Sequence, residues 1–157
     1  MTKIKFTILG LMFVFSNYLV SAQELRVEPN GNITVHTGAT LDISGGDLVL
    51  KSDDSGDASL IDHGSITFSG GGETQVHRYL TDGHWHLLSS PVSNSQSGMF
   101  LGDYLQYHSE SSNGWTDIAA DNYNLALMQG YSLWSIEAGP TTEVFSGLTN
   151  TGSQNKA

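Results

Sequence analysis

The chain of 157 residues contains no cysteine, only three prolines, and only six lysines and arginines. Without cysteine there are no disulfides, no thiol catalysis and no thiolate zinc sites, so the fold must be held by core packing or by metal ions. Sixteen acidic residues give a formal net charge of −10 at pH 7. We therefore expect no binding to nucleic acid or to anionic membranes, which both require clustered basic side chains.

Charged residues are also scarce, at 14% of the chain, whereas glycine is abundant, with 18 residues. Helical bundles need more charge and more alanine, leucine, glutamate and lysine than this sequence has. Many glycines with a 10% share of aromatic residues suit short strands joined by tight turns. The composition therefore predicts an all-β protein.

The sequence has one long apolar segment, residues 6–20, which follows Lys3 and Lys5 and ends in Val20-Ser21-Ala22. This pattern predicts a secretory signal peptide over residues 1–22. The alternative is a membrane anchor, but the segment is shorter than the roughly 20 residues that a span requires. Cleavage would remove both of these lysines and leave residues 23–157 even more acidic than the whole chain. We expect a secreted or cell-surface protein with no membrane span after cleavage.

Residues 23–70 form a glycine-rich region with a loose internal repeat. A glycine precedes a short apolar segment five times, at positions 31, 38, 46, 56 and 64, so the spacing is nearly constant. In most segments the apolar residues stand at i and i+2, which puts both on one side of a strand. Such short strands must stack, either as solenoid-like rungs or as a small antiparallel meander. The near-constant period favours the solenoid.

Residues 73–157 read as a second unit, an antiparallel β-sandwich, after a predicted boundary at Gly70-Gly71-Gly72. Alternating and aromatic segments predict strands at 74–80, 85–89, 104–109, 115–118, 131–136 and 142–146. The pair Asn113-Gly114 predicts a hairpin between two of them. Residues 124–128 are consistent with a strand or a single helical turn. Fewer strands can be placed than the roughly seven of a typical sandwich. We therefore expect the sandwich to be incomplete.

Two segments, Val76-His-Arg-Tyr-Leu80 and Trp85-His-Leu-Leu-Ser-Ser-Pro-Val92, resemble a module of large secreted surface proteins of Bacteroidetes-type bacteria. Residues 107–115, Gly130-Tyr131 and residues 145–152 resemble its later parts. The resemblance implies export by the type IX secretion system. Such proteins usually end in a C-terminal sorting domain, which this sequence lacks, so the resemblance also implies a truncated module. The family has no agreed enzymatic residues.

Two groups of residues are candidates for metal binding. His84 and His86 stand at i and i+2 and could share a metal ion, although no third ligand at a suitable spacing is evident. Alternation instead predicts Trp85 and Leu87 in the core, with both histidines facing water. The acidic run Asp53, Asp54 and Asp57 has the composition of a calcium loop, and a calcium ion there would be structural. The alternative is a solvated acidic turn.

Tryptophans and tyrosines form a further candidate set. If exposed, Trp85, Trp115 and Trp134 could stack on sugar rings and bind a carbohydrate. The alternative, favoured by the burial preferences of aromatic residues, is core packing.

No catalytic motif is present. There is no Gly-x-Ser-x-Gly elbow, phosphate loop or dinucleotide fingerprint. Ser89 and Ser90 lie near His86 and Asp82 in the sequence, but nearness along a strand does not make a catalytic triad. The sequence therefore favours a non-catalytic structural or adhesion module that contacts extracellular polysaccharide or other surface proteins. The alternatives are a carbohydrate-binding module and, less favoured, a fragment of a metal-dependent hydrolase.

Overall fold

The computed structural model describes residues 24–136 and 138–150, and these form an all-β fold, as predicted. The predicted signal peptide lies outside the described residues. Within them there is no helix with the length and hydropathy needed to cross a membrane. The elements are β1 (Glu24–Val27), β2 (Asn32–Val35), β3 (Thr40–Asp42), β4 (Asp47–Leu50), β5 (Ser52–Asp53), β6 (Gly56–Asp57), β7 (Ser59–Asp62), β8 (Ser65–Thr67), β9 (Thr74–Leu80), β10 (Trp85–Leu88), a 3-10 helix η1 (Ser97–Phe100), β11 (Tyr104–Ser109), β12 (Gly114–Asp117), β13 (Tyr131–Trp134) and β14 (Thr141–Gly147).

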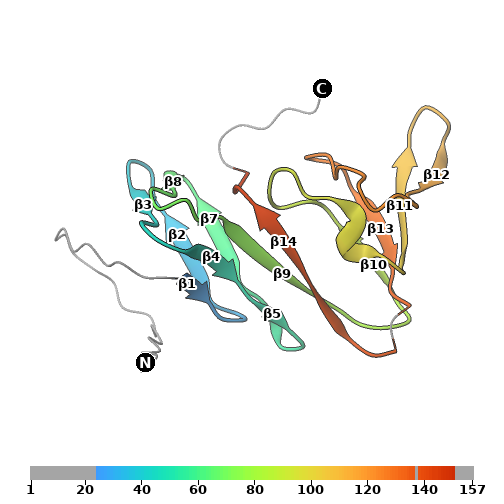
Figure 1. Cartoon of the computed structure of the whole chain (residues 1–157), viewed down its shortest axis with the longest axis horizontal. Helices are drawn as coiled ribbons and strands as arrows, with labels where there is room; N and C mark the ends of the chain where they lie inside the picture. The colour runs from blue at the N-terminus through green and yellow to red at the C-terminus, as the bar shows by residue number, and fades with distance from the viewer. Residues whose placement is uncertain (1–23, 137, 151–157) are drawn as a thin grey trace.

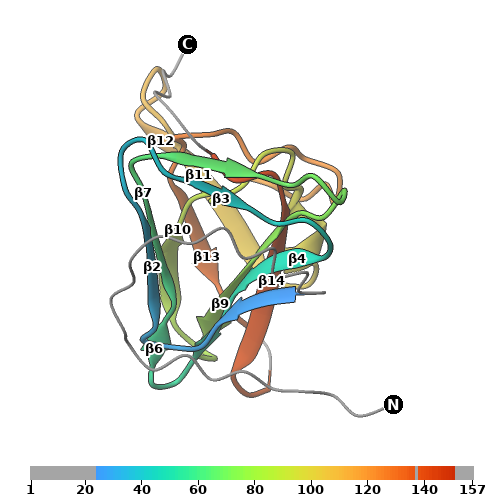
Figure 2. The ribbon, with the colours of Figure 1, turned by 90° about the vertical axis from the view of Figure 1, so that its left-hand side faces the viewer.

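The glycine-rich region forms a short parallel solenoid, so the meander alternative is wrong. Strand β1 pairs in parallel with β4, β2 with β7, and β3 with β8. Viewed end-on, these pairs occupy the three sides of a triangle (Figure 2). Apolar residues stack inside it from rung to rung, with Leu25 on Leu48 and Ile33 on Leu60.

One rung of the solenoid is longer than the spacing between successive glycines. The paired positions of neighbouring rungs include Glu24 with Asp47 and Thr40 with Ser65. Each such pair is separated in the sequence by about three of the glycine spacings, because a rung passes along all three sides of the triangle. The glycine period therefore corresponds to one side of the triangle rather than to one rung.

Glycines at the corners serve two different purposes. Gly38 has φ of +81° in open space, so it supplies the left-handed turn that the sequence predicted. Gly64 does not have a positive φ, but a Cβ there would lie 2.4 Å from the carbonyl oxygen of Ala39 in the preceding rung. Glycine is thus required at some corners for the turn and at others for close stacking of the rungs.

Strand β9 connects the solenoid to the second half of the molecule. Its first residues pair in parallel with β4, as the start of a third rung, and its whole length pairs antiparallel with β14. The resulting sheet has the order β1-β4-β9-β14 and runs across the predicted boundary at Gly70-Gly71-Gly72 (Figure 1). Strands β9 and β14 form one layer of the sandwich, while the apolar residues of β1 and β4 pack inside the solenoid.

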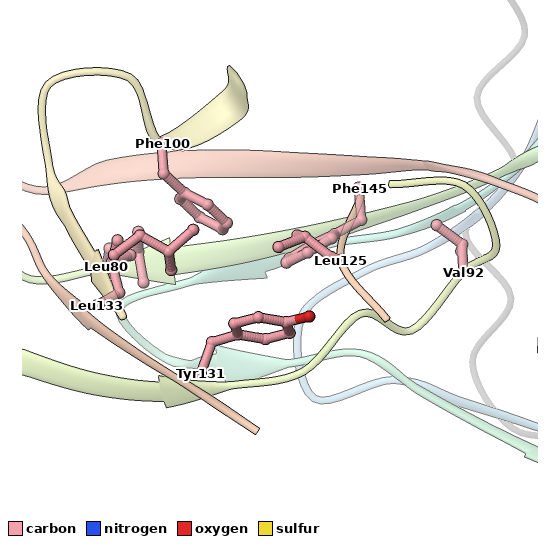
Figure 3. Packing of buried hydrophobic residues seen from close by; sticks show 8 residues of the cluster. Leu80, Val92, Phe100, Leu125, Tyr131, Leu133 and Phe145 are labelled. Atoms are coloured by element: carbon pink, nitrogen blue, oxygen red, sulfur yellow. The ribbon is translucent and has the colours of Figure 1, made fainter. Parts of the chain in front are cut away.

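The second layer is the four-stranded antiparallel sheet β10-β13-β11-β12. Its β11–β12 hairpin turns through Asn113, whose φ is +48°, as the Asn-Gly pair predicted. Residues 124–128 form neither a strand nor a helical turn. Between the layers Phe100 meets Phe145 edge-on, with ring centroids 5.8 Å apart (Figure 3). Eight buried residues make this core: Leu80, Val92, Phe100, Leu105, Leu125, Tyr131, Leu133 and Phe145.

Tight stacking of the solenoid makes Gly72 sensitive to any side chain. A Cβ at Gly72 would lie 1.7 Å from the carbonyl oxygen of Gly46, whereas a Cβ at Gly45 would meet nothing within 4 Å. We expect Gly72→Ala to lower the free energy of unfolding by roughly 1–3 kcal/mol, the usual effect of overpacking. Gly45→Ala is the matched control and should change it by less than about 0.5 kcal/mol. Urea denaturation measures both, and equal stability of the two variants would contradict the stacking.

His77 makes stability depend on pH. Its Nδ1 lies 3.4 Å from Lys51 Nζ. Burial and the positive charges of Lys51 and Arg26 lower the pKa of His77, against a smaller opposite effect of Glu24. The unfolded chain therefore binds a proton at a higher pH than the folded chain does. The free energy of unfolding should fall as pH drops below about 6.5 and level off below the folded-state pKa.

Replacing His77 removes this proton linkage. We expect His77→Gln to flatten the fall in stability between about pH 7 and pH 5, measured by urea denaturation at each pH. The exposed His63 provides the control variant, His63→Gln, which should keep the wild-type slope. An unchanged slope in His77→Gln would show that another group is responsible.

Candidate functional site

The outer face of the β10-β13-β11-β12 sheet carries a row of three aromatic side chains. Trp85 on β10 lies opposite Trp134 on β13, and Trp134 lies opposite Tyr104 on β11. Residues directly opposite one another in a sheet point to the same side. The three rings therefore stand side by side across three neighbouring strands, on the side away from the core.

Alternation places further residues on the same side. A second row holds Leu87, Ser132, Gln106 and Asp117, and a third holds His108 and Trp115. We call these nine residues the aromatic face: Trp85, Leu87, Tyr104, Gln106, His108, Trp115, Asp117, Ser132 and Trp134. The sheet lies at the end of the molecule remote from β1 (Figure 1).

The aromatic face is open to solvent. The exposed fractions are 55% for Trp85, 63% for Tyr104 and 56% for Trp115, and Trp134 is half-buried between its neighbours. Leu87 is 78% exposed. A folded chain normally leaves large apolar side chains exposed singly, whereas a group of them on one surface marks an interaction site.

The expectation that Trp85 and Leu87 point into the core is wrong. The burial of β10 has the opposite phase, so that His86 and Leu88 face inward and Leu88 packs against the core of the sandwich. Strand β10 has apolar residues on both of its sides. Its pairing with β13 decides which side is buried, because Leu88 lies opposite the fully buried Tyr131. Core packing is likewise wrong for Trp115 and Tyr104.

The rings on the face are fixed by contacts with one another. Trp85 and Trp134 meet edge-to-face, with centroids 5.4 Å apart and an interplanar angle of 62°. In the third row His108 and Trp115 make a similar contact at 5.4 Å and 74°. Edge-to-face pairs of this kind contribute roughly 0.5–1.5 kcal/mol beyond burial. The face is therefore partly organised before any ligand arrives.

The electrostatic character of the face is weak. Its one carboxylate, Asp117, accepts a hydrogen bond of 2.6 Å from the side-chain amide of Gln106. The lysine and arginine residues that the structure describes are Arg26, Lys51 and Arg78, and none of them lies on this sheet. The face offers aromatic surface and hydrogen-bonding groups but no fixed positive charge.

The two candidate histidines are each engaged by a separate backbone carbonyl. The ring Nδ1 of His84 lies 2.6 Å from the oxygen of Asp82, and Nε2 of His86 lies 2.9 Å from the oxygen of Thr81. Among the described residues, no three histidine, aspartate or glutamate side chains come together as a metal site would require. Metal binding by His84 and His86 stays a prediction.

The acidic turn is organised by the protein's own hydrogen bonds. The carboxylate of Asp53 accepts bonds from the hydroxyl and the backbone N–H of Ser55, and these bonds lower the pKa of Asp53. The carboxylate of Asp57 accepts from Ser52 and forms an ion pair with Arg78 at 2.5 Å. The carboxylates of Asp53 and Asp57 thus already serve the β5–β6 hairpin, and Asp54 is exposed. Calcium binding at this turn stays a prediction.

A shallow groove of about 500 Å³ lies where the solenoid meets the end of β14. Its two carboxylates are Asp47 and Glu73, and Asp47 accepts bonds from the Glu73 N–H and the Gln75 side chain. No histidine lines the groove, and its carboxylate Asp47 is already engaged by hydrogen bonds within the protein. The full lining is Asp47, Gly71, Gly72, Glu73, Ser93, Asn94, Ser146, Gly147 and Leu148.

Sequence reasoning named Trp85, Trp115 and Trp134 but did not find their arrangement. The structure places all three on one face, brings Trp85 and Trp134 into contact, and puts Trp115 in another row. Tyr104 was one of the tyrosines of the candidate set, but its place as the third member of the row was not predicted. Alternation along β11 was a local sign that Tyr104 points away from the core. Its position beside Trp134 depends on the pairing of β11 with β13, which are far apart in the sequence, so a local pattern cannot predict it.

Comparison of the chain with protein-family models, with curated proteins and with solved structures gave no match. The function is therefore inferred from the geometry of the chain itself.

The exposure of the three tryptophans can be tested by fluorescence. Variants that keep one tryptophan each, with the other two replaced by phenylalanine, separate their signals. We expect Trp85 and Trp115 to be quenched by acrylamide more strongly than the half-buried Trp134 and to emit at longer wavelength. Equal quenching of Trp85 and Trp134 would contradict the outward direction of the Trp85 side chain on β10.

Proposed function

We propose that this chain is a non-catalytic adhesion module of a secreted or cell-surface protein, and that it binds through the aromatic face. The observation that carries the proposal is the grouping of Trp85, Leu87 and Tyr104 on one side of one sheet, all more than half exposed. Burial of such a group on a partner gains free energy in proportion to the apolar area removed from water, roughly 25 cal/mol per Å². Soluble proteins rarely expose an apolar patch of this kind unless it is an interaction site.

The solenoid has a structural role in this proposal. It adds a stiff parallel stack beside the sandwich and contributes β1 and β4 to the sheet that backs the binding layer. Repeats of this kind lengthen a protein by stacking and do not need catalytic residues. This arrangement suits a module that holds a binding surface away from an anchoring point.

The serine and histidine residues near the face support a non-catalytic role. Ser90 is buried and its hydroxyl donates to the carbonyl oxygen of Val92, while His86 is engaged by Thr81. A serine nucleophile is activated by an adjacent general base, in many enzymes a histidine, and Ser90 and His86 are not bonded to each other. The geometry therefore offers no support for a hydrolase.

The predicted signal peptide and the resemblance to type IX-secreted surface proteins support export as the route to this role. An acidic, cysteine-free chain fits a place outside the cell, where charge maintains solubility. Export and surface location are part of the proposal.

A second candidate function is carbohydrate binding, and one observation favours it specifically. Trp85, Trp134 and Tyr104 lie in a single row, whereas an interface with a protein needs only a patch. Aromatic rings in a row can stack on successive sugar rings of one chain.

Adhesion is tested with the mature protein, residues 23–157, labelled and applied to fixed cells and matrix of the bacterium that produces it. We expect the triple variant Trp85→Ala, Leu87→Ala, Tyr104→Ala to lose at least about 90% of the bound signal, because the truncation of each of the two rings alone removes roughly a tenfold factor. The matched control replaces three exposed apolar residues elsewhere, Ile61, Met128 and Leu148, with alanine. The control should bind like the wild type. Equal loss in both variants would show that the face has no special role.

A further inference from the structure

The aromatic row has a defined length and direction. Neighbouring strands lie about 4.8 Å apart, so Trp85 and Tyr104, with β13 between them, are separated by roughly 10 Å. The row crosses the strands at right angles to their direction. An extended polysaccharide has sugar rings at intervals close to the strand spacing. A chain laid along this row would therefore place one sugar over each strand.

The rings of the row are not coplanar. The planes of Trp85 and Trp134 are 62° apart, and the twist of the sheet turns each strand by roughly 20–25° relative to the next, an angle that the 62° already includes. A flat crystalline polysaccharide surface needs coplanar rings to contact it. A single chain can rotate about its glycosidic bonds and meet rings at different angles. The geometry favours one free chain.

The charge of the face selects among chains. No lysine or arginine of the described residues lies on this sheet, so the carboxylates or sulfates of an acidic polysaccharide would have no counter-charge. The formal net charge of the whole chain is negative, which repels acidic polymers further. An uncharged chain meets no charge repulsion on this face, and its C–H groups can contact the aromatic rings.

The second row provides hydrogen bonds beside the rings. Gln106 and Asp117 already bond to each other at 2.6 Å, which holds both side chains on the face. The amide and carboxylate groups can together donate to and accept from sugar hydroxyls. Rings that provide contact area, with fixed polar groups alongside, are a general design for small-molecule recognition.

We propose that the ligand of the aromatic face is a single, extended, uncharged polysaccharide chain that crosses β10, β13 and β11 along Trp85, Trp134 and Tyr104. This inference rests on the proposed adhesion function and adds the chemical class of the ligand, its direction and its contact residues. Trp115 lies outside the path, in the row formed with His108.

The inference is tested by isothermal titration of the mature protein with hexasaccharides. The uncharged extended probes are cellohexaose, xylohexaose and mannohexaose. Maltohexaose represents a coiled chain, and hexagalacturonate represents a charged one. We expect at least one of the three extended probes to bind, and maltohexaose and hexagalacturonate to bind at least about tenfold more weakly. Because Trp85 and Tyr104 lie two strands apart, the disaccharide of the same series should also bind at least about tenfold more weakly than the hexasaccharide.

Variants of the face test the path of the chain. Trp85→Ala and Tyr104→Ala should each weaken binding by about tenfold, whereas Trp115→Ala should stay within about twofold. Trp115 is the matched control, because its exposed fraction of 56% is close to that of Trp85 at 55%. Unchanged circular dichroism and melting temperature show that each variant is folded, and Trp85→Phe, which keeps a ring, should retain most of the affinity.

The outcomes separate this inference from the proposed function. No binding to any uncharged hexasaccharide, or equal loss in Trp115→Ala and Trp85→Ala, overturns the polysaccharide inference. If the triple variant still loses attachment to cells in that case, adhesion stands and the partner is a protein. Preference for hexagalacturonate overturns the argument from charge. If attachment to cells does not depend on the face, the proposed function itself fails.

Discussion

The whole fold depends on the double pairing of β9. One edge of this strand continues the parallel stack of the solenoid through β4, and the other edge pairs antiparallel with β14. A single row of side chains crosses the joint, in which Leu50 lies opposite Val76 and Val76 lies opposite Phe145. Val76 packs against both hydrophobic cores. The two halves are therefore held together by one sheet and by one shared residue, without a flexible linker.

This joint also explains the surface on the opposite side of the molecule. Strands β9 and β14 cover the inner side of β10-β13-β11-β12, and their Leu80 and Phe145 form one core with Leu105, Tyr131 and Leu133. Nothing in the described chain covers the outer side, where Trp85 and Tyr104 remain exposed. One layer of the sandwich is thus fixed by the solenoid, and the other layer is left free to present its rings.

Local patterns in the sequence predicted the elements well and their partners poorly. The strands at 74–80 and 104–109 begin and end as predicted, and Asn113-Gly114 correctly indicated the β11–β12 hairpin. Apolar residues at i and i+2 and the spacing of glycines favoured a solenoid over a meander but did not decide between them. These signals are properties of a few neighbouring residues, so they can be read without knowledge of the fold.

Local patterns could not predict which side of β10 faces the core, nor which residues stand opposite one another in the aromatic row. Trp85-His-Leu-Leu88 has apolar residues in both phases, and only the packing of Leu88 onto the core decides which side faces water. The place of β9 was also a question of partners, because β9 pairs with β4 of the solenoid on one edge and with β14 of the sandwich on the other. Tertiary contacts, rather than local propensity, made each of these choices.

The place of β9 has a consequence for the order in which the chain folds. The pairing of β9 with β14 closes a long loop, from Leu80 to Thr141, which is entropically slow to form. Each solenoid rung closes a much shorter loop, such as the one from Leu50 to Val76. A formed rung presents the free edge of β4, to which β9 can pair before β14 is in place. We expect the solenoid to form first and to fix the register of β9, and through β9 the register of β14.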